Sequence, residues 1–372
     1  MKSGTDPYKI LFPLGGVLGL FGVALWPLFT YGLITFYPRQ SHASIMYFGF
    51  LWSFVAGFMM TAIPRMTQAA KANTFEVAGA VLLVIIQVAV SVVLSFKASV
   101  FVFILQSVFL IIFVLRRFLL HKRVPFFGVL FIPFAFFQAF AGAVVYLVWR
   151  PDPYVFFLLS GEAFILNLIL GVGSRLIPVI SRLPNAVMPD VATPDKKLAT
   201  YLSLALILNL SFYVQLFYSQ QMGLILRLAV ILWVAFRVIK IYLKSEQNTL
   251  LGWGLRAGLL FLLSSYLVNL YEGAIHLPAQ HLLFIGGFTL ITLMVATRVV
   301  LAHGGVSLDY ELKSKRIFII ILSVSMAAIL RYLAGVNILG HLMLLAVIFL
   351  AVALLLWLRK TLKVHIESLR ML

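Results

Sequence analysis

The stretch SHASIMYFGFLWSFVAGFMMTAIPRM, residues 41–66, decides the fold of this chain. It is almost wholly apolar over the roughly 20 residues that a helix needs to cross the hydrocarbon of a bilayer. Backbone groups in lipid must be hydrogen-bonded within their own segment, and the stretch lacks the alternation of a barrel strand. It therefore predicts a transmembrane α-helix, and it raises the question of why an ionisable His42 lies at its mouth.

Apolar stretches of this length recur along the chain, which has 372 residues, 63% of them hydrophobic and 11% charged. We expect an all-α integral membrane protein with about twelve transmembrane helices and no soluble domain. Interruptions by charged residues, Pro and Gly place the helices near residues 10–37, 43–65, 75–96, 99–120, 125–149, 154–180, 198–218, 223–243, 250–271, 279–302, 316–335 and 339–359.

Positive charge is distributed unevenly between the two sets of loops. One set holds most of the Lys and Arg residues, whereas the other holds little beyond Arg39, Lys97, Arg150 and Arg331. The positive-inside rule then predicts that both termini are cytoplasmic. The net charge of +18 is explained by this topology and by anionic lipid headgroups, so no nucleic-acid partner is expected. RRFLLHKR, residues 116–123, is interpreted as a topology signal rather than a recruitment site.

Missing residues exclude several kinds of chemistry. The chain has no cysteine, which excludes disulfides, iron–sulfur clusters and thiolate ligands. Any transition metal must therefore be held by His, Met or oxygen ligands. The chain also lacks a Walker loop, a dinucleotide-binding fingerprint, an HExxH motif and a C-x-x-C-H haem attachment site.

Three stretches of the chain end alike: VAGFMMTAIPRMT (55–67), LGVGSRLIPVIS (170–181) and MVATRVVLAHG (294–304). When Thr61, Arg175 and Arg298 are aligned, they lie 114 and then 123 residues apart, close to four spans each time. We interpret this as one transmembrane domain built from three four-helix repeats, approximately residues 1–120, 121–243 and 244–372, in a pseudo-threefold arrangement. Chance similarity among apolar helices is the alternative.

The histidines form two groups. Four are predicted near the outer face (His42, His276, His281 and His341) and three toward the cytoplasm (His121, His303 and His365). An ionisable group within a membrane is a functional candidate because its desolvation is costly. Each outer histidine could instead only bond a loop carbonyl. His42 and His281 begin corresponding repeat helices, so we predict that they are the axial ligands of a b-type haem, with Met46 and His276 near it.

The residues that follow these two histidines suit a flat apolar cofactor. Met46, Phe48 and Gly49 follow His42, and Phe284, Gly286, Gly287 and Phe288 follow His281. Aromatic walls and glycines allow close approach of a planar group, although ordinary helix packing uses the same residues.

Glu162 is the acidic residue that lies clearly within a span. A buried carboxylate is costly unless it is protonated, paired with a cation or bound to metal, so we expect one of these states. Proton transfer or contact with the haem edge would make Glu162 the candidate catalytic residue; a hydrogen bond to a neighbouring helix is the structural alternative. Arg175 and Arg298 lie near inner helix ends, where they either reach the headgroups or bind an anion or carboxylate.

Several of these stretches, taken in order, resemble the NnrS family. The likeness rests on HASIMYFGFLWSFVAGFMMTAIPRMT, GVGSRLIPVISR and HLLFIGGFTLITLMVATRVVLAHGG. This resemblance implies a twelve-helix bacterial membrane protein associated with haem, copper and the nitric oxide response. Matched residue by residue, it implies roles for His42, Met46, Gly49, Gly57, Thr61, Pro64, His281, Arg298 and His303, with His42, His281 and His303 as metal ligands.

The chain departs from the family pattern at two places. Ser44 and Ile45 stand where the family commonly has a second histidine and a glutamate, and no arginine follows Gly304 and Gly305. Loss of an imidazole at Ser44 removes a metal ligand, so haem is expected and copper is left open. HASIMYFGF also has a fainter likeness to haem–copper oxidase catalytic subunits, but the histidines of their binuclear centre are missing here.

The sequence therefore predicts a membrane haem protein that acts on, or responds to, nitric oxide and exchanges electrons with quinol. A cofactor-free transporter or channel is the main alternative, and a structural scaffold is the third.

Overall fold

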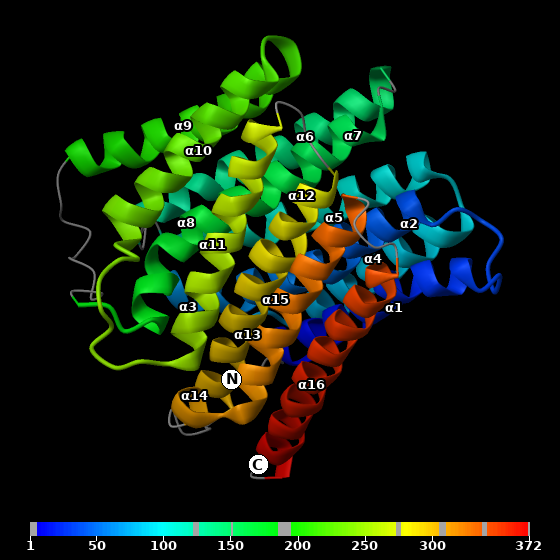
Figure 1. Cartoon of the computed structure of the whole chain (residues 1–372). Coiled ribbons are helices and arrows are strands. Elements are labelled where there is room, and N and C mark those ends of the chain that lie inside the picture. Colours follow the sequence, from blue (N-terminus) through cyan, green and yellow to red (C-terminus); the bar gives the residue numbers. More distant parts are fainter. Residues whose placement is uncertain are drawn as a thin grey trace. The chain divides into compact units, whose positions relative to one another are not determined.

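The computed structural model describes residues 6–121, 126–149, 152–184, 195–272, 277–304, 310–336 and 341–370. All regular elements within these ranges are helical, and twelve helices among them are long and apolar enough to cross a membrane (Figure 1). The predicted all-α membrane fold with twelve spans is confirmed.

Nine of the spans in the described ranges are built around one α-helix each. These helices are α1 (Tyr8–Thr30), α4 (Thr74–Val93), α5 (Phe96–His121), α6 (Phe131–Trp149), α9 (Asp195–Phe217), α10 (Gln220–Trp233), α11 (Leu250–Tyr271), α15 (Lys315–Gly335) and α16 (Leu342–Arg370). A 3-10 turn, η2 (Phe127–Leu130), precedes α6, and a π-helical turn, η4 (Val234–Ile239), extends α10. A short helix, α14 (Tyr310–Lys313), precedes α15.

The second, sixth and tenth spans share a different construction. Each is a short α-helix, then a π-helical segment, then a longer α-helix. The three series are α2 (Arg39–Ser44), η1 (Ile45–Leu51) and α3 (Trp52–Met66); α7 (Pro153–Phe156), η3 (Phe157–Ala163) and α8 (Phe164–Ile180); and α12 (Leu277–His281), η5 (Leu282–Thr289) and α13 (Leu290–His303). Long π-helical segments are rare. A fourth one, η4, lies in the eighth span, outside the four-span spacing, so the repeat stays a prediction.

The first span is shorter than predicted, because α1 ends at Thr30 rather than near residue 37. Gly32 has a φ of 71°, a left-handed conformation that ends a helix. The Gly32 N–H donates to the Phe29 oxygen at 3.0 Å and the Leu33 N–H to the Leu28 oxygen at 2.8 Å. These two bonds satisfy the last carbonyls of α1, and the chain leaves the helix although the following residues are still apolar.

The last helix extends further than predicted. Helix α16 continues to Arg370, whereas the sequence places its end near residue 359. The added stretch RKTLKVHIESLR contains no Gly or Pro and consists largely of good helix formers. A change from apolar to polar residues therefore marks the end of the apolar span but not the end of the helix.

The chain divides into two compact units. Unit 1 comprises Met1–Pro125, Ala139–Gly161 and Leu354–Leu372, and unit 2 comprises Phe126–Gln138 and Glu162–Ala353. In unit 1, α1 packs on α3 and η1, and α4 packs on α5. In unit 2, α9 and α10 are paired, and α11 packs on η5 and α13. The pseudo-threefold arrangement of the repeats stays a prediction.

Candidate functional site

His42 lies in α2 of unit 1, just before η1. Its Nδ1 is 2.8 Å from the main-chain oxygen of Gly22 in α1, and the Trp26 ring meets the imidazole edge-on with centroids 5.8 Å apart. A carbonyl oxygen can only accept, so Nδ1 carries the proton and Nε2 carries the lone pair. This is the tautomer of an Nε2 metal ligand, and proteins commonly orient such ligands through an Nδ1–H bond to a carbonyl.

His281 ends α12 in unit 2 and has the same arrangement. Its Nδ1 is 2.8 Å from the main-chain oxygen of Leu277, one turn earlier, and the Phe284 ring lies edge-on at 5.9 Å. Both imidazoles are thus fixed in one tautomer by a carbonyl that belongs to a helix. A bond through Nδ1 is compatible with ligation through Nε2. That the two rings hold one haem stays a prediction.

His42 and His281 lie at different positions relative to the π-helical segment that follows each of them. His281 immediately precedes η5, whereas the residue that immediately precedes η1 is Ser44, two residues after His42. Ser44 is 1% exposed, and its Oγ has no hydrogen-bond partner among the described residues. Ser44, and not His42, therefore has the same position relative to its π-helical segment as His281.

Met46 and the glycines near the histidines make close helix contacts. A Cβ on Gly22 would lie 2.9 Å from the Met46 sulfur, so Met46 packs on the turn of α1 that accepts the His42 bond. A Cβ on Gly49 would lie 3.1 Å from Val88 in α4, and one on Gly286 would lie 2.4 Å from Phe261 in α11. Gly49 and Gly286 thus serve helix packing, the alternative that the sequence left open.

Three of the remaining histidines differ in their positions along the chain. His303 ends α13, His341 is exposed before α16, and His276 lies outside the described residues. No group of three or more His, Asp or Glu side chains placed to hold a metal ion occurs within the described ranges. A haem held by two imidazoles does not need such a group.

Glu162 lies in η3 and is 3% exposed. Its Oε1 is 3.1 Å from Nη1 of Arg227 in α10 and accepts a 2.8 Å hydrogen bond from the Tyr266 hydroxyl in α11. Of the states expected for a buried Glu162, namely protonated, paired with a cation or bound to metal, the structure shows the pairing with a cation. Its Oε2 accepts no hydrogen bond within the part of the chain that the structure describes.

Arg227 is the residue that the sequence analysis missed. It is fully buried in α10, where Nε donates to Ser211 Oγ at 3.3 Å and Nη2 donates to Gln215 Oε1 at 2.7 Å. Its guanidinium carbon lies 3.5 Å from the centre of the Phe212 ring. The signal was present, because an arginine within GLILRLAVILW should prompt a search for a buried acidic partner.

The family assignment agrees with this architecture. A sequence profile described as NnrS protein matches residues 5–367, essentially the whole chain. The chain belongs to the NnrS family. No curated protein matches it. The predicted resemblance is confirmed, and this NnrS-family protein is a multi-pass membrane protein by its twelve candidate spans in the described ranges.

Arg175 and Arg298, which the sequence analysis aligned with each other, have neighbours within this NnrS-family chain. Nη1 of Arg298 donates to Oε1 of Glu311, a 1% exposed residue in α14, so the predicted carboxylate interaction is made within the chain. The guanidinium of Arg175 lies 5.2 Å from the centre of the Phe126 ring.

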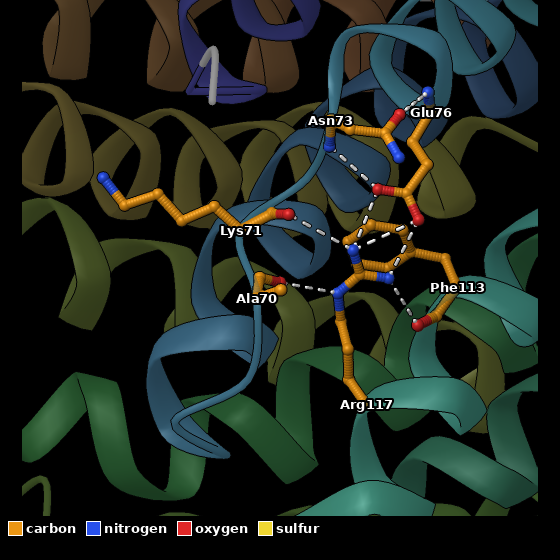
Figure 2. Close-up of polar contacts among 6 residues, drawn as sticks. All are labelled: Ala70, Lys71, Asn73, Glu76, Phe113 and Arg117. Atoms are coloured by element: carbon orange, nitrogen blue, oxygen red, sulfur yellow. Dashed lines mark hydrogen bonds and ion pairs between the residues drawn. The ribbon is translucent and has the colours of Figure 1, made fainter. Parts of the chain in front are cut away.

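A second buried arginine lies in the basic stretch that was interpreted as a topology signal. Arg117 in α5 is 7% exposed and bonds both oxygens of Glu76 in α4, the shortest contact being 2.8 Å to Oε2 (Figure 2). It also donates to the main-chain oxygens of Ala70 and Phe113 at 3.1 Å and of Lys71 at 3.5 Å. Arg117 therefore fastens the loop between α3 and α4 to α5, a structural role beyond topology.

Proposed function

We propose that this NnrS-family protein is a membrane haem protein of the response to nitric oxide and nitrosative stress, in a bacterial inner membrane with cytoplasmic termini. The observation that supports the haem most directly is that His42 and His281 have the same tautomer, fixed by the same kind of hydrogen bond. Each imidazole donates Nδ1–H to a helix carbonyl at 2.8 Å, and each lies at the start of a span with a π-helical segment. Such segments are frequent at functional sites.

The residues present fit a b-type haem better than a copper ion. His42 and His281 would bind the haem iron, and the bonds to Gly22 and Leu277 would fix the orientation of each ring. Ser44 offers no imidazole, and the described residues contain no cluster of three His, Asp or Glu side chains. A bound haem would supply an iron that accepts and returns single electrons. The proposal therefore includes haem, and copper is left open.

Quinol is the proposed electron donor, because it dissolves in the same membrane that the twelve candidate spans cross. The chain supplies the two imidazoles and an apolar environment, which together set the potential of a bound haem. Nitric oxide is the proposed oxidant or ligand. This assignment rests on membership in the NnrS family and on the predicted ligand pair.

The absorption spectrum of protein purified from haem-replete cells tests the proposal. We expect a Soret band that is lost in His42→Ala and in His281→Ala, and kept in His341→Ala, whose histidine is exposed. His42→Gly should regain the band when imidazole is added, which separates loss of a ligand from loss of fold. A folded wild-type protein without a Soret band would refute the haem.

Two further measurements test the redox role. Added quinol should reduce the haem of the wild-type protein, and a strain that lacks the protein should grow more slowly under nitric oxide. Reduction by dithionite but not by quinol would contradict the proposed donor. Normal growth of the deletion strain under nitric oxide would contradict the stress response.

A cofactor-free transporter or channel is the second candidate. Four of the described spans contain π-helical segments, and unit 2 holds the buried Glu162–Arg227 pair, both of which are features of transport pathways. This alternative predicts colourless folded protein and ion or solute flux in proteoliposomes. Stoichiometric haem without flux would exclude it.

A further inference from the structure

The Glu162 carboxylate is hydrogen-bonded on one oxygen only. Arg227 and Tyr266 both donate to Oε1, and Oε2 accepts no hydrogen bond in the described structure. Burial disfavours an ionised carboxylate unless hydrogen bonds to its oxygens offset the loss of water, and here only Oε1 accepts them. We propose that Glu162 is a proton-binding site, with Oε2 as the atom that binds and releases the proton.

The surroundings of Glu162 allow both protonation states. The charged and titratable groups that touch it are Arg227 from α10 and Tyr266 from α11, whereas α9 contributes the uncharged Ser211 and Gln215 to the Arg227 side. The guanidinium does not lose its proton in proteins. Ionised Glu162 therefore makes a neutral pair, and protonated Glu162 leaves one positive charge that Ser211, Gln215 and the Phe212 ring still contact.

Protonation of this cluster would respond to negative charge placed near it. In a low-dielectric interior, a net positive charge in the cluster becomes favourable when an electron is added nearby. Without the added electron, the neutral ion pair is favoured. The cluster is thus suited to compensate the charge of a reduced cofactor.

The cluster lies within about two turns of one end of its helices. Gln215 is in the last turn of α9, Arg227 is about two turns after the start of α10, and Tyr266 is in the last two turns of α11. The connection between α9 and α10 is a turn at Tyr218 and Ser219. The predicted topology places this end of the helices on the outer side, so we assign proton exchange to the outer aqueous phase.

The use of this site rests on the proposed haem function. Oxidation of one quinol releases two electrons and two protons to form a quinone. For each electron that a bound haem would accept, the Glu162 carboxylate would take up one proton and become a neutral carboxylic acid. When the electron leaves to an oxidant, Glu162 returns that proton, so charge and atoms balance over the cycle.

Infrared difference spectroscopy on the wild-type protein in lipid tests the proton site without any haem. Acidification should produce a carboxylic-acid C=O band that shifts in heavy water and in protein made with isotope-labelled glutamate. Glu162→Gln should lose the band, whereas the matched control Glu76→Gln, which alters the other buried pair, should keep it. Tyr266→Phe, which leaves the carboxylate intact, should shift the band. A band that persists in Glu162→Gln, or the absence of any glutamate band, would overturn the proposal.

Reduction by dithionite then tests the coupling in the haem-loaded protein. The same glutamate band should appear on reduction, and the midpoint potential should fall as pH rises, by up to about 59 mV per pH unit for one proton per electron. Glu162→Gln should abolish most of that slope. A protein with the pH-induced band but no haem would refute the proposed function alone. A haem protein whose potential keeps its slope in Glu162→Gln would refute the coupling alone.

Discussion

The two buried arginine–glutamate pairs contain the same residue types and differ in the number of hydrogen bonds that each carboxylate accepts. In each, a guanidinium binds a glutamate and stacks on a phenylalanine ring, at 3.4 Å on Phe113 and at 3.5 Å on Phe212. Arg117 bonds both oxygens of Glu76 and three main-chain carbonyls, whereas Arg227 reaches only Oε1 of Glu162. A complete set of bonds fixes one charge state, and an incomplete set allows the charge to change.

The pairs also differ in their access to water. The Glu76 side chain, in the first turn of α4 next to the preceding loop, is 17% exposed. The Glu162 side chain, within a span, is 4% exposed. Water can partly replace a lost partner at Glu76, whereas nothing replaces one at Glu162. The same substitution should therefore cost more in unit 2 than in unit 1, although the unit 1 pair has more hydrogen bonds.

The largest effect is expected for Arg227→Met, which leaves the Glu162 carboxylate buried without a cation. Breaking a buried pair in this way costs about 3–5 kcal/mol. We expect a matching loss of unfolding free energy in detergent, or loss of folded protein on size exclusion.

The double variant Arg227→Met with Glu162→Met is the control for that prediction. Removing both charges together should restore most of the stability, because apolar replacement of a whole buried pair is often neutral or stabilising. If the double variant is as unstable as the single one, packing of the Arg227 stem and not the charge is responsible.

A smaller loss is expected for Arg117→Ala, because Glu76 can be rehydrated. Charged hydrogen bonds are worth about 1.5–3 kcal/mol, so we expect a loss of about 2 kcal/mol in unfolding free energy. Arg117→Lys should recover only part of it, since an ammonium cannot reproduce the two-pronged contact with Glu76. The neighbouring exposed Arg116, changed to Ala, should have little effect. A loss of unfolding free energy for Arg117→Ala that exceeds the loss for Arg227→Met would contradict the expectation that the unit 2 pair is the more costly one to break.

The fold was largely predictable from the sequence because hydropathy and length determine membrane spans. All twelve spans were found, and the errors occur where local geometry overrides hydropathy. Gly32 ends α1 while the residues after it are still apolar, and α16 continues where the residues are already polar. Hydropathy does not report whether the backbone continues as a helix.

The candidate site was predictable only in part. Glu162 stood out as an acid within a span, but Arg227 was overlooked because positive charges were considered mainly as loop residues that set topology. The π-helical segments were also missed, since no residue pattern distinguishes their hydrogen bonds from those of an α-helix. Residue types indicated which groups need partners, and tertiary structure was needed to show which partners they have.

Tyr266→Phe should weaken the unit 2 pair more gently than loss of Arg227. It removes the 2.8 Å hydrogen bond to Glu162 Oε1 and keeps the ring, so we expect a loss of about 1–2 kcal/mol in unfolding free energy. The control is Tyr271→Phe on the same helix, where the side chain is 90% exposed and a change near zero is expected. Equal effects of the two variants would mean that the Tyr266 hydroxyl does not stabilise the pair.

The smallest effect is expected for Asn73→Ala, which removes the cap of α4 beside the unit 1 pair. Asn73 Oδ1 accepts from the Glu76 N–H at 2.8 Å, while Glu76 Oε2 accepts from the Asn73 N–H at 2.9 Å. The second bond uses main chain and survives the substitution, so we expect a loss of about 1 kcal/mol in unfolding free energy and none for Asn73→Asp. Because Arg117 still holds both carboxylate oxygens, Glu76 keeps its position without the cap. A loss for Asn73→Ala as large as that for Arg117→Ala would mean that the cap positions the Arg117–Glu76 ion pair. The two-oxygen contact of Arg117 with Glu76 would then depend on the loop between α3 and α4.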